Sequence, residues 1–132
     1  DAAFGVFDGC RYTDSTGRPT YSPFWPASLS GVTNIEWYVI PFDPLMECEI
    51  QAGGSIANTA IGDSADVVIA AGNANTGVSG SYMNTTLKGA AAVGNFRILG
   101  AAPYADNAFG DSYTIVRVQI AKNQLLTEVN SI

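Results

Sequence analysis

Apolar residues are densest over residues 35–52, IEWYVIPFDPLMECEIQA. In the first half of this run, Trp37 and Val39 fall on one side of an extended chain, whereas Tyr38 and Ile40 fall on the other. Because neither side is cleanly polar, this half predicts a strand that is covered on both of its faces.

The second half of the run alternates between polar and apolar positions. Leu45, Glu47, Glu49 and Gln51 share one side, and Met46, Cys48, Ile50 and Ala52 share the other. A period of two with one wet and one dry face predicts a strand that packs on one side of a core. The pair Asp43-Pro44 separates the halves and predicts a turn, since a residue before proline avoids the helical region.

Further strands are predicted where short apolar stretches lie between turn-forming residues. They cover residues 4–13, 20–25, 66–71, 95–101 and 112–121. In the first, Gly5 and Gly9 indicate a bulge or a close backbone approach. The sequence DSTGRP after it predicts a hairpin turn. Pro23 and Pro26 make the second an edge strand that ends early, because proline cannot donate to a ladder.

One short helix is predicted over residues 55–65, SIANTAIGDSA, where Ile56 and Ala60 recur at helical spacing and Gly62 ends the pattern. Residues 72–94 are rich in Gly, Asn, Thr, Ser and Ala and predict a long loop, within which Leu87 marks a short strand.

Seven or eight short strands separated by turn signals predict an all-β fold, a compact sandwich or barrel with one short helix. A chain of 132 residues suits one domain. We therefore expect a single β domain over residues 1–125 and a C-terminal tail over residues 126–132.

The charge pattern excludes some partners. The net charge is −6, and the six Lys and Arg residues are scattered, with no two adjacent. Without a basic stripe to follow a phosphate backbone, we expect no nucleic-acid binding. No apolar run reaches the ~18 residues that a membrane-spanning helix needs, so we expect no membrane partner.

Candidate chemistry is sparse. The chain has no histidine, which removes Ser-His and Cys-His arrangements and most zinc sites. No GxSxG, P-loop or dinucleotide fingerprint occurs. The paired carboxylates are Glu47 with Glu49, Asp63 with Asp66, and Asp106 with Asp111. The glutamates predict a solvated strand face, and the aspartates predict turns rather than a calcium loop. We expect no catalytic residue, cofactor or metal, and a carboxylate hydrolase is the least favoured function.

Two cysteines, Cys10 and Cys48, lie inside predicted strands. Buried thiols that pack as small hydrophobes are the expected state. A disulfide between them is the alternative, because the sequence of a single pair of cysteines does not decide whether they are bonded.

Five aromatic residues lie at predicted edge or loop positions, where large aromatics serve either as satellite core or as interface anchors. The candidates for a protein interface are Tyr21, Phe24, Trp25, Tyr104 and Phe109.

Three segments resemble a family of small structural proteins of tailed phages from marine and freshwater environments. They are FGVFDGCRYTDSTGRPTYSPFWP, then FDPLMECEIQAGGSIANTAIGDSADV with AGNANTGVSG, and finally DNAFGDSYTIVRVQIAKNQL. The resemblance covers residues 4–125 and rests on structural signatures that identify no active site.

The resemblance implies a non-enzymatic virion protein, made in the host cytoplasm, that decorates the capsid surface as a cement protein. Its partners would be the major capsid protein and itself, as a homotrimer. The alternative from the residues is an extracellular or fibre-like β-module that binds glycan or a host surface, which loop aromatics and Asn-rich turns permit.

Overall fold

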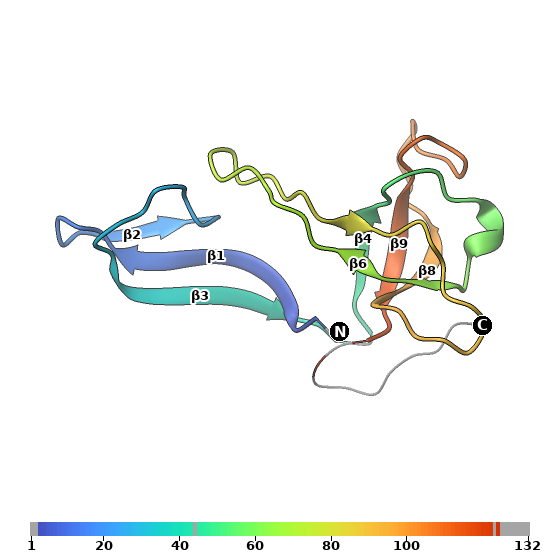
Figure 1. The fold of residues 1–132 in the computed structure, drawn as a ribbon, viewed down its shortest axis with the longest axis horizontal. Coiled ribbons are helices and arrows are strands. Elements are labelled where there is room, and N and C mark those ends of the chain that lie inside the picture. The colour runs from blue at the N-terminus through green and yellow to red at the C-terminus, as the bar shows by residue number, and fades with distance from the viewer. Residues whose placement is uncertain (1–2, 44, 123, 125–132) are drawn as a thin grey trace. The chain divides into compact units, whose positions relative to one another are not determined.

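The computed structural model describes residues 3–43, 45–122 and 124, so the predicted tail over 126–132 lies outside the described residues. The described part contains nine β-strands and one short 3₁₀ helix (Figure 1). Its strand pairs are antiparallel and no sheet closes into a barrel. The prediction of an all-β fold is confirmed, and the arrangement is consistent with a sandwich.

Tertiary contacts divide the chain into two compact units, which are described one at a time. The core unit comprises Asp1–Phe4, Phe42–Ile69 and Ser81–Ile132. The sheet unit comprises Gly5–Pro41 and Ala70–Gly80. The expected single domain over residues 1–125 stays a prediction.

The core unit contains a four-stranded sheet and a two-stranded ribbon. The sheet has the order β4 (Glu47–Gln51), β9 (Ile115–Ile120), β8 (Phe96–Ala101) and β5 (Ser64–Ala65), of which Figure 1 labels the first three. The ribbon pairs β6 (Val67–Val68) with β7 (Tyr82–Met83). Strands that are distant in sequence are neighbours in this sheet, so the sheet forms only when the whole unit folds.

The core of this unit lies against one face of the four-stranded sheet. Val116, Val118 and Ile120 alternate with the exposed Arg117 along β9. On β4 the apolar positions are half-buried and the polar positions exposed, as its period of two predicts. The buried cluster consists of Phe42, Ala52, Ile56, Ala60, Ala65, Met83, Phe96, Ile98, Val116, Val118 and Ile120.

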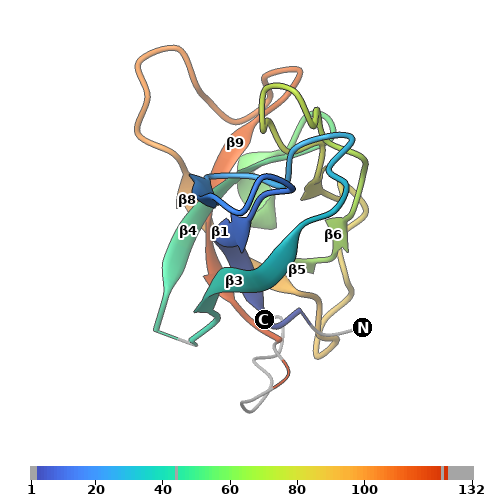
Figure 2. The ribbon, with the colours of Figure 1, turned by 90° about the vertical axis from the view of Figure 1, so that its left-hand side faces the viewer.

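The sheet unit contains three strands in the order β2 (Pro19–Ser22), β1 (Gly5–Thr13) and β3 (Thr33–Pro41). Strands β1 and β3 lie side by side in both views (Figures 1 and 2). The ladder between them shifts register between Phe7 and Gly9, and Gly9 has a φ of 127°. The predicted bulge in β1 is therefore confirmed, as is the position of β2 at a sheet edge.

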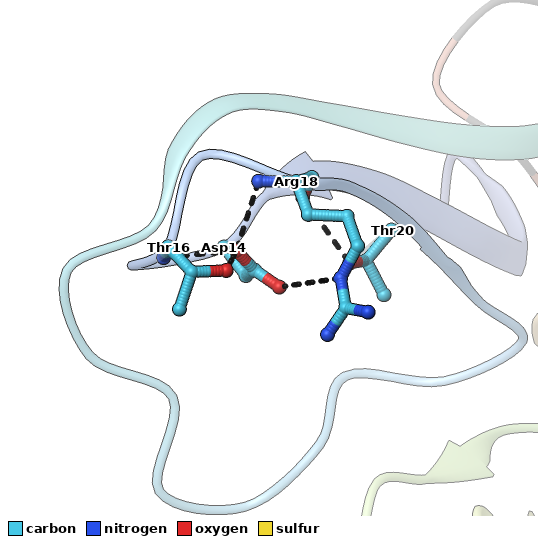
Figure 3. A network of polar contacts seen from close by, with 4 residues as sticks. All are labelled: Asp14, Thr16, Arg18 and Thr20. Atoms are coloured by element: carbon cyan, nitrogen blue, oxygen red, sulfur yellow. Dashed lines mark hydrogen bonds and ion pairs between the residues drawn. The ribbon is translucent and has the colours of Figure 1, made fainter.

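The turn between β1 and β2 is organised by one carboxylate, that of Asp14 (Figure 3). Its Oδ1 accepts hydrogen bonds from the Thr16 hydroxyl at 2.6 Å, the Thr16 N–H at 2.9 Å and the Arg18 N–H at 3.0 Å. The Arg18 Nε lies 3.6 Å from Asp14 Oδ2. The predicted hairpin turn is confirmed, and Asp14 supplies the acceptor that its donors need.

The helix predicted over residues 55–65 is wrong. Only Asn58–Ala60 forms a single 3₁₀ turn. The main chain then leaves helical geometry to bond with β8, since the Gly62 N–H donates to the Ile98 carbonyl and the Ile98 N–H donates to the Asp63 carbonyl. Tertiary pairing with a buried strand outweighs the weak helical preference of so short a segment.

Two strand predictions also need correction. The strand predicted over residues 66–71 is only Val67–Val68, and Ile69 is 78% exposed. The strand in the 72–94 loop is at Tyr82–Met83, whereas Leu87 packs against the core without joining a strand.

The largest correction concerns β3. All nine of its residues are exposed, although the sequence predicts a strand covered on both faces. The described residues of the sheet unit provide β1 as a partner along one edge of β3, but over its faces only Trp25, whose ring packs on Trp37, and no continuous layer.

Candidate interaction surface

The three-stranded sheet presents two apolar faces, which the strand register assigns. Directly opposed residues of antiparallel strands point to the same side of a sheet. The tryptophan face contains Phe7, Cys10, Ile35, Trp37 and Val39. The tyrosine face contains Val6, Arg11, Tyr21, Glu36, Tyr38 and Ile40.

Four aromatic rings pack in series on the tryptophan face. Trp37 lies between two of them, with ring centroids 4.7 Å from Trp25 and 5.6 Å from Phe7. Trp25 in turn contacts Tyr12, with centroids 5.9 Å apart. The Cys10 thiol donates to the Phe24 carbonyl at 3.7 Å, which ties the segment after β2 to this face. The series fixes the rings, yet Trp37 stays 52% exposed.

The tyrosine face is shaped by the glycine of the bulge. A Cβ on Gly9 would lie 3.0 Å from both the Tyr21 hydroxyl oxygen and the Ser22 carbonyl oxygen, so the Tyr21 ring crosses β1 only because Gly9 lacks one. The Tyr21 ring reaches Tyr38 with centroids 6.3 Å apart. The Tyr38 hydroxyl donates to Glu36 Oε2 at 3.3 Å. Two tyrosines and one carboxylate therefore form a polar rim on an apolar face.

The exposed apolar area is large for so small a sheet. Phe7, Tyr21, Trp37 and Tyr38 are 41%, 63%, 52% and 38% exposed. With about 200 Å² for each aromatic side chain, the two aromatics on each face leave roughly 200 Å² of that face open to solvent. Val6, Ile35, Val39 and Ile40 add to this area. Patches of a few hundred Å² on a monomer mark sites that bind another molecule.

A second feature of the sheet unit is a hollow of ≈250 Å³ beside Phe24 and Trp25. The hairpin of residues 70–80 lines its other side, where the Phe24 ring occupies the space that a Cβ on Gly77 would need. The Asn73 side chain accepts the N–H groups of Asn75 and Thr76 and so shapes this hairpin. The hollow is shallow, with one aromatic wall and one wall of small residues.

The interface candidates from the sequence fall in both units. Tyr21, Phe24 and Trp25 lie in the sheet unit, where Tyr21 is exposed and the other two are half-buried. Tyr104 and Phe109 belong to the core unit. The Tyr104 hydroxyl donates to the Glu49 carboxylate, which raises the pKa of Tyr104. Phe109 is half-buried against the core.

Sequence reasoning missed the apolar residues of β1 and β3 as surface residues. They are Val6, Phe7, Ile35, Trp37, Tyr38, Val39 and Ile40. Their signal was present, because a strand that is apolar on both sides requires two covering layers. None of the elements predicted from the sequence would form the layers that cover the two faces of this strand.

The paired carboxylates serve structural contacts. Glu47 lies 3.8 Å from the Arg117 guanidinium, and Glu49 accepts from Tyr104. Asp66 pairs with Lys88 at 2.7 Å. Among the described residues, no group of three or more Cys, Asp or Glu side chains is placed to hold a metal ion. The same part of the chain has no helix long and apolar enough to cross a membrane.

Both cysteines are free thiols, Cys10 buried and Cys48 half-buried. Burial raises the pKa of each thiol, so both are protonated at neutral pH. A protonated, buried thiol is a poor nucleophile.

No protein-family model, curated protein or solved structure matches this chain. Its most distinctive surface is a three-stranded sheet with exposed aromatic and aliphatic residues on both faces, which suits binding to other protein surfaces.

Proposed function

We propose that this chain is a non-enzymatic virion structural protein, a cement protein that binds the outer face of a phage head and bridges adjacent capsomers. The observation that carries the proposal is β3, a nine-residue strand whose residues are all exposed. An apolar strand with no cover from its own unit suits a protein that works in contact with neighbouring subunits.

The form of the surface supports protein partners. Interfaces are enriched in Tyr, Trp and Phe and depleted in charge at their centre. The two faces of the sheet carry Phe7, Tyr21, Trp37 and Tyr38, with Arg11 and Glu36 directly opposed on the tyrosine face. Two faces allow one sheet to contact two neighbours, which is what bridging requires.

The rest of the chain supports a role as a rigid anchor. The core unit has a continuous apolar cluster, and three of its carboxylates, those of Glu47, Asp66 and Glu49, pair with Arg117, Lys88 and Tyr104 in turn. A net charge of −6 would make decorated particles repel one another. In this proposal the chain sits on the capsid as a homotrimer at three-fold or quasi-three-fold points, held to the major capsid protein by several modest contacts at once.

Particles with and without the chain test the cement role. Heads that lack it are expected to lose resistance to heat and to osmotic shock, and addition of the wild-type chain is expected to restore both. A double variant, Phe7→Ser with Ile40→Ser, weakens both faces and is expected to restore neither. The matched control is Tyr113→Ser, which removes a side chain that is 62% exposed in the core unit. Undecorated heads that are as robust as decorated ones would contradict the proposal.

A glycan-binding module is the second candidate, and the hollow beside Trp25 favours it. Glycan sites commonly combine an aromatic wall with side-chain amides, and Asn73 lines the opposite side. However, the Asn73 oxygen already accepts two main-chain N–H groups, and the Trp25 ring contacts Tyr12 and Trp37. Binding on a glycan array that is lost with Trp25→Ala would favour this candidate, and symmetric density on capsids would exclude it.

A further inference from the structure

The outer edge of β3 is an open sheet edge. Within the described residues β3 pairs with β1 alone, and no other strand of the sheet unit lies along its far side (Figure 1). An edge strand presents a row of main-chain N–H and C=O groups that can pair with another chain. Natural proteins usually protect such edges with lysine, proline, a β-bulge or a short strand. Strand β3 has nine residues and no lysine, its single proline, Pro41, is its last residue, and its bulge lies at Asn34, near its start.

The sequence of β3 is complementary to itself when two copies run antiparallel. We propose that two copies of this chain pair through their β3 edges, with a two-fold axis at Trp37, so that two three-stranded sheets join into one sheet of six strands. Trp37 is the midpoint of Thr33–Pro41, and a bulge at Asn34, whose φ is 50°, leaves the regular pairing in this register to residues 35–39. It deepens the proposed function by naming one partner, a second copy, and it rests on that function for its biological setting.

The charge pattern selects this register. Glu36 is the single charged residue of β3. With the axis at Trp37, Glu36 of one copy opposes Tyr38 of the other, and the Tyr38 hydroxyl already donates to Glu36 within one chain. An axis at Glu36 would set two carboxylates directly opposite each other, which destabilises a strand pair. An axis at Tyr38 would set Glu36 against Ile40 and leave the carboxylate beside an aliphatic side chain.

The apolar positions agree with the same axis. On the tryptophan face, Ile35 of one copy opposes Val39 of the other, and the two Trp37 side chains meet at the axis. Pairs of β-branched residues and pairs of aromatic residues across strands stabilise a sheet by about 0.2–1 kcal/mol each. The pairing continues both faces of the sheet into the second copy, so the apolar surface of each face doubles in extent.

The contact is expected to be weak for a pair of free chains. A stable interface covers about 800 Å² on each partner, and the edge of one nine-residue strand covers less. On a capsid, where trimers hold many copies at high local concentration, such two-fold contacts would link neighbouring trimers into a net. Free chains should therefore show a monomer–dimer equilibrium that shifts with concentration.

Cysteine pairing between copies tests the register directly. Ile35→Cys and Val39→Cys are made in separate full-length chains, and wild type with Cys10 and Cys48 sets the background. Under mild oxidation neither variant should form a covalent dimer alone, whereas an equimolar mixture should form the mixed dimer severalfold above background. Opposed residues of antiparallel strands have Cα atoms 4.5–5.5 Å apart, within disulfide range. Equal linkage in the mixture and in the single variants would overturn the proposal.

A second measurement covers the case in which a cysteine disturbs the strand. Light scattering of the wild-type chain should show a mass that rises with concentration toward a multiple of the monomer. Trp37→Lys, which sets two like charges at the axis, should abolish the β3-dependent step. Tyr113→Lys, at a side chain that is 62% exposed in the core unit, should leave it unchanged. A wild-type chain that stays monomeric overturns the pairing without touching the cement role, which is measured on particles with the major capsid protein present.

Discussion

Strands β3 and β4 come from one continuous apolar run but have opposite surroundings. In β4, Cys48 and Ile50 are half-buried on the core side, and Glu47, Glu49 and Gln51 face outward. In β3 every residue is exposed, including Trp37 and Ile40. Two halves of one apolar run therefore have different roles. The second builds the core of its own unit, and the first remains available to surfaces outside the chain.

Core truncation should give the largest difference between the two regions. Ile98 is fully buried in the core unit, and Ile98→Ala should lower the free energy of unfolding by roughly 2–5 kcal/mol. Ile40 is 42% exposed, and Ile40→Ala should change it by about 0.5 kcal/mol or less. Urea unfolding of the free chains measures both. Equal losses would mean that β3 is covered in solution.

The bulge gives the next effect, and it acts within the sheet unit. Gly9→Ala adds a Cβ at a φ of 127°, 3.0 Å from the Tyr21 hydroxyl oxygen and the Ser22 carbonyl oxygen. Strained backbone of this kind destabilises by about 1–3 kcal/mol. Gly17→Ala is the matched control, because its φ is 86° but nothing lies within 4 Å of the added atom. A loss for Gly17→Ala as large as that for Gly9→Ala would show that crowding against Tyr21 contributes nothing.

Binding to undecorated heads should distinguish a substitution in the sheet unit from one in the core unit, with a difference in binding free energy of about 2 kcal/mol. Tyr21 and Tyr113 are 63% and 62% exposed, the first on the tyrosine face and the second in the core unit. If Tyr21 is an interface anchor, Tyr21→Ala should weaken binding to undecorated heads by about 2 kcal/mol, roughly thirtyfold. Tyr113→Ala should bind as wild type does. Titration of labelled chain onto heads measures both, and equal affinities would remove the tyrosine face from the interface.

The smallest effect concerns the tip of the sheet unit. The Thr16 hydroxyl and then the Arg18 N–H hydrogen bond lower the pKa of Asp14 from 3.8 to about 2. Because the folded pKa lies below the unfolded one, this stabilisation is complete above pH 3.8 and is lost as the pH falls toward 2. NMR titration of the carboxyl carbon measures it. Thr16→Val removes the main cause and should raise the pKa of Asp14; an unchanged value would contradict the assigned network.

Local patterns predicted much of the fold. The alternation along β4 and β9, the turn signal at Asp14 and the glycine at the β1 bulge each concern residues that are close together in the chain. Such features depend on local backbone geometry and on which face of a strand is apolar, and the local sequence indicates both. The all-β class follows from them.

The predictions that were wrong concern segments whose structure depends on partners far away in the chain or outside it. The segment around Asn58–Ala60 gave up helical geometry to bond with β8, which lies about forty residues onward. Ile69 is exposed although its neighbours Val67 and Val68 pair with β7. For β3, the pattern states that two faces are apolar but not which molecule covers them. The sequence pattern accordingly indicates loop aromatics such as Tyr104, which contacts Glu49, as interface candidates and not β3.

The central claim is that neighbouring subunits on the capsid cover the three-stranded sheet. Hydrogen exchange on decorated heads tests it most directly. The N–H groups of residues 33–40 in β3 are measured in the free chain and on the particle, with those of Glu47–Gln51 as the internal reference. The account predicts that exchange in β3 slows on the particle while exchange in β4 stays the same. Particles that carry the chain at full occupancy, with β3 exchanging as fast as in the free chain, would contradict it.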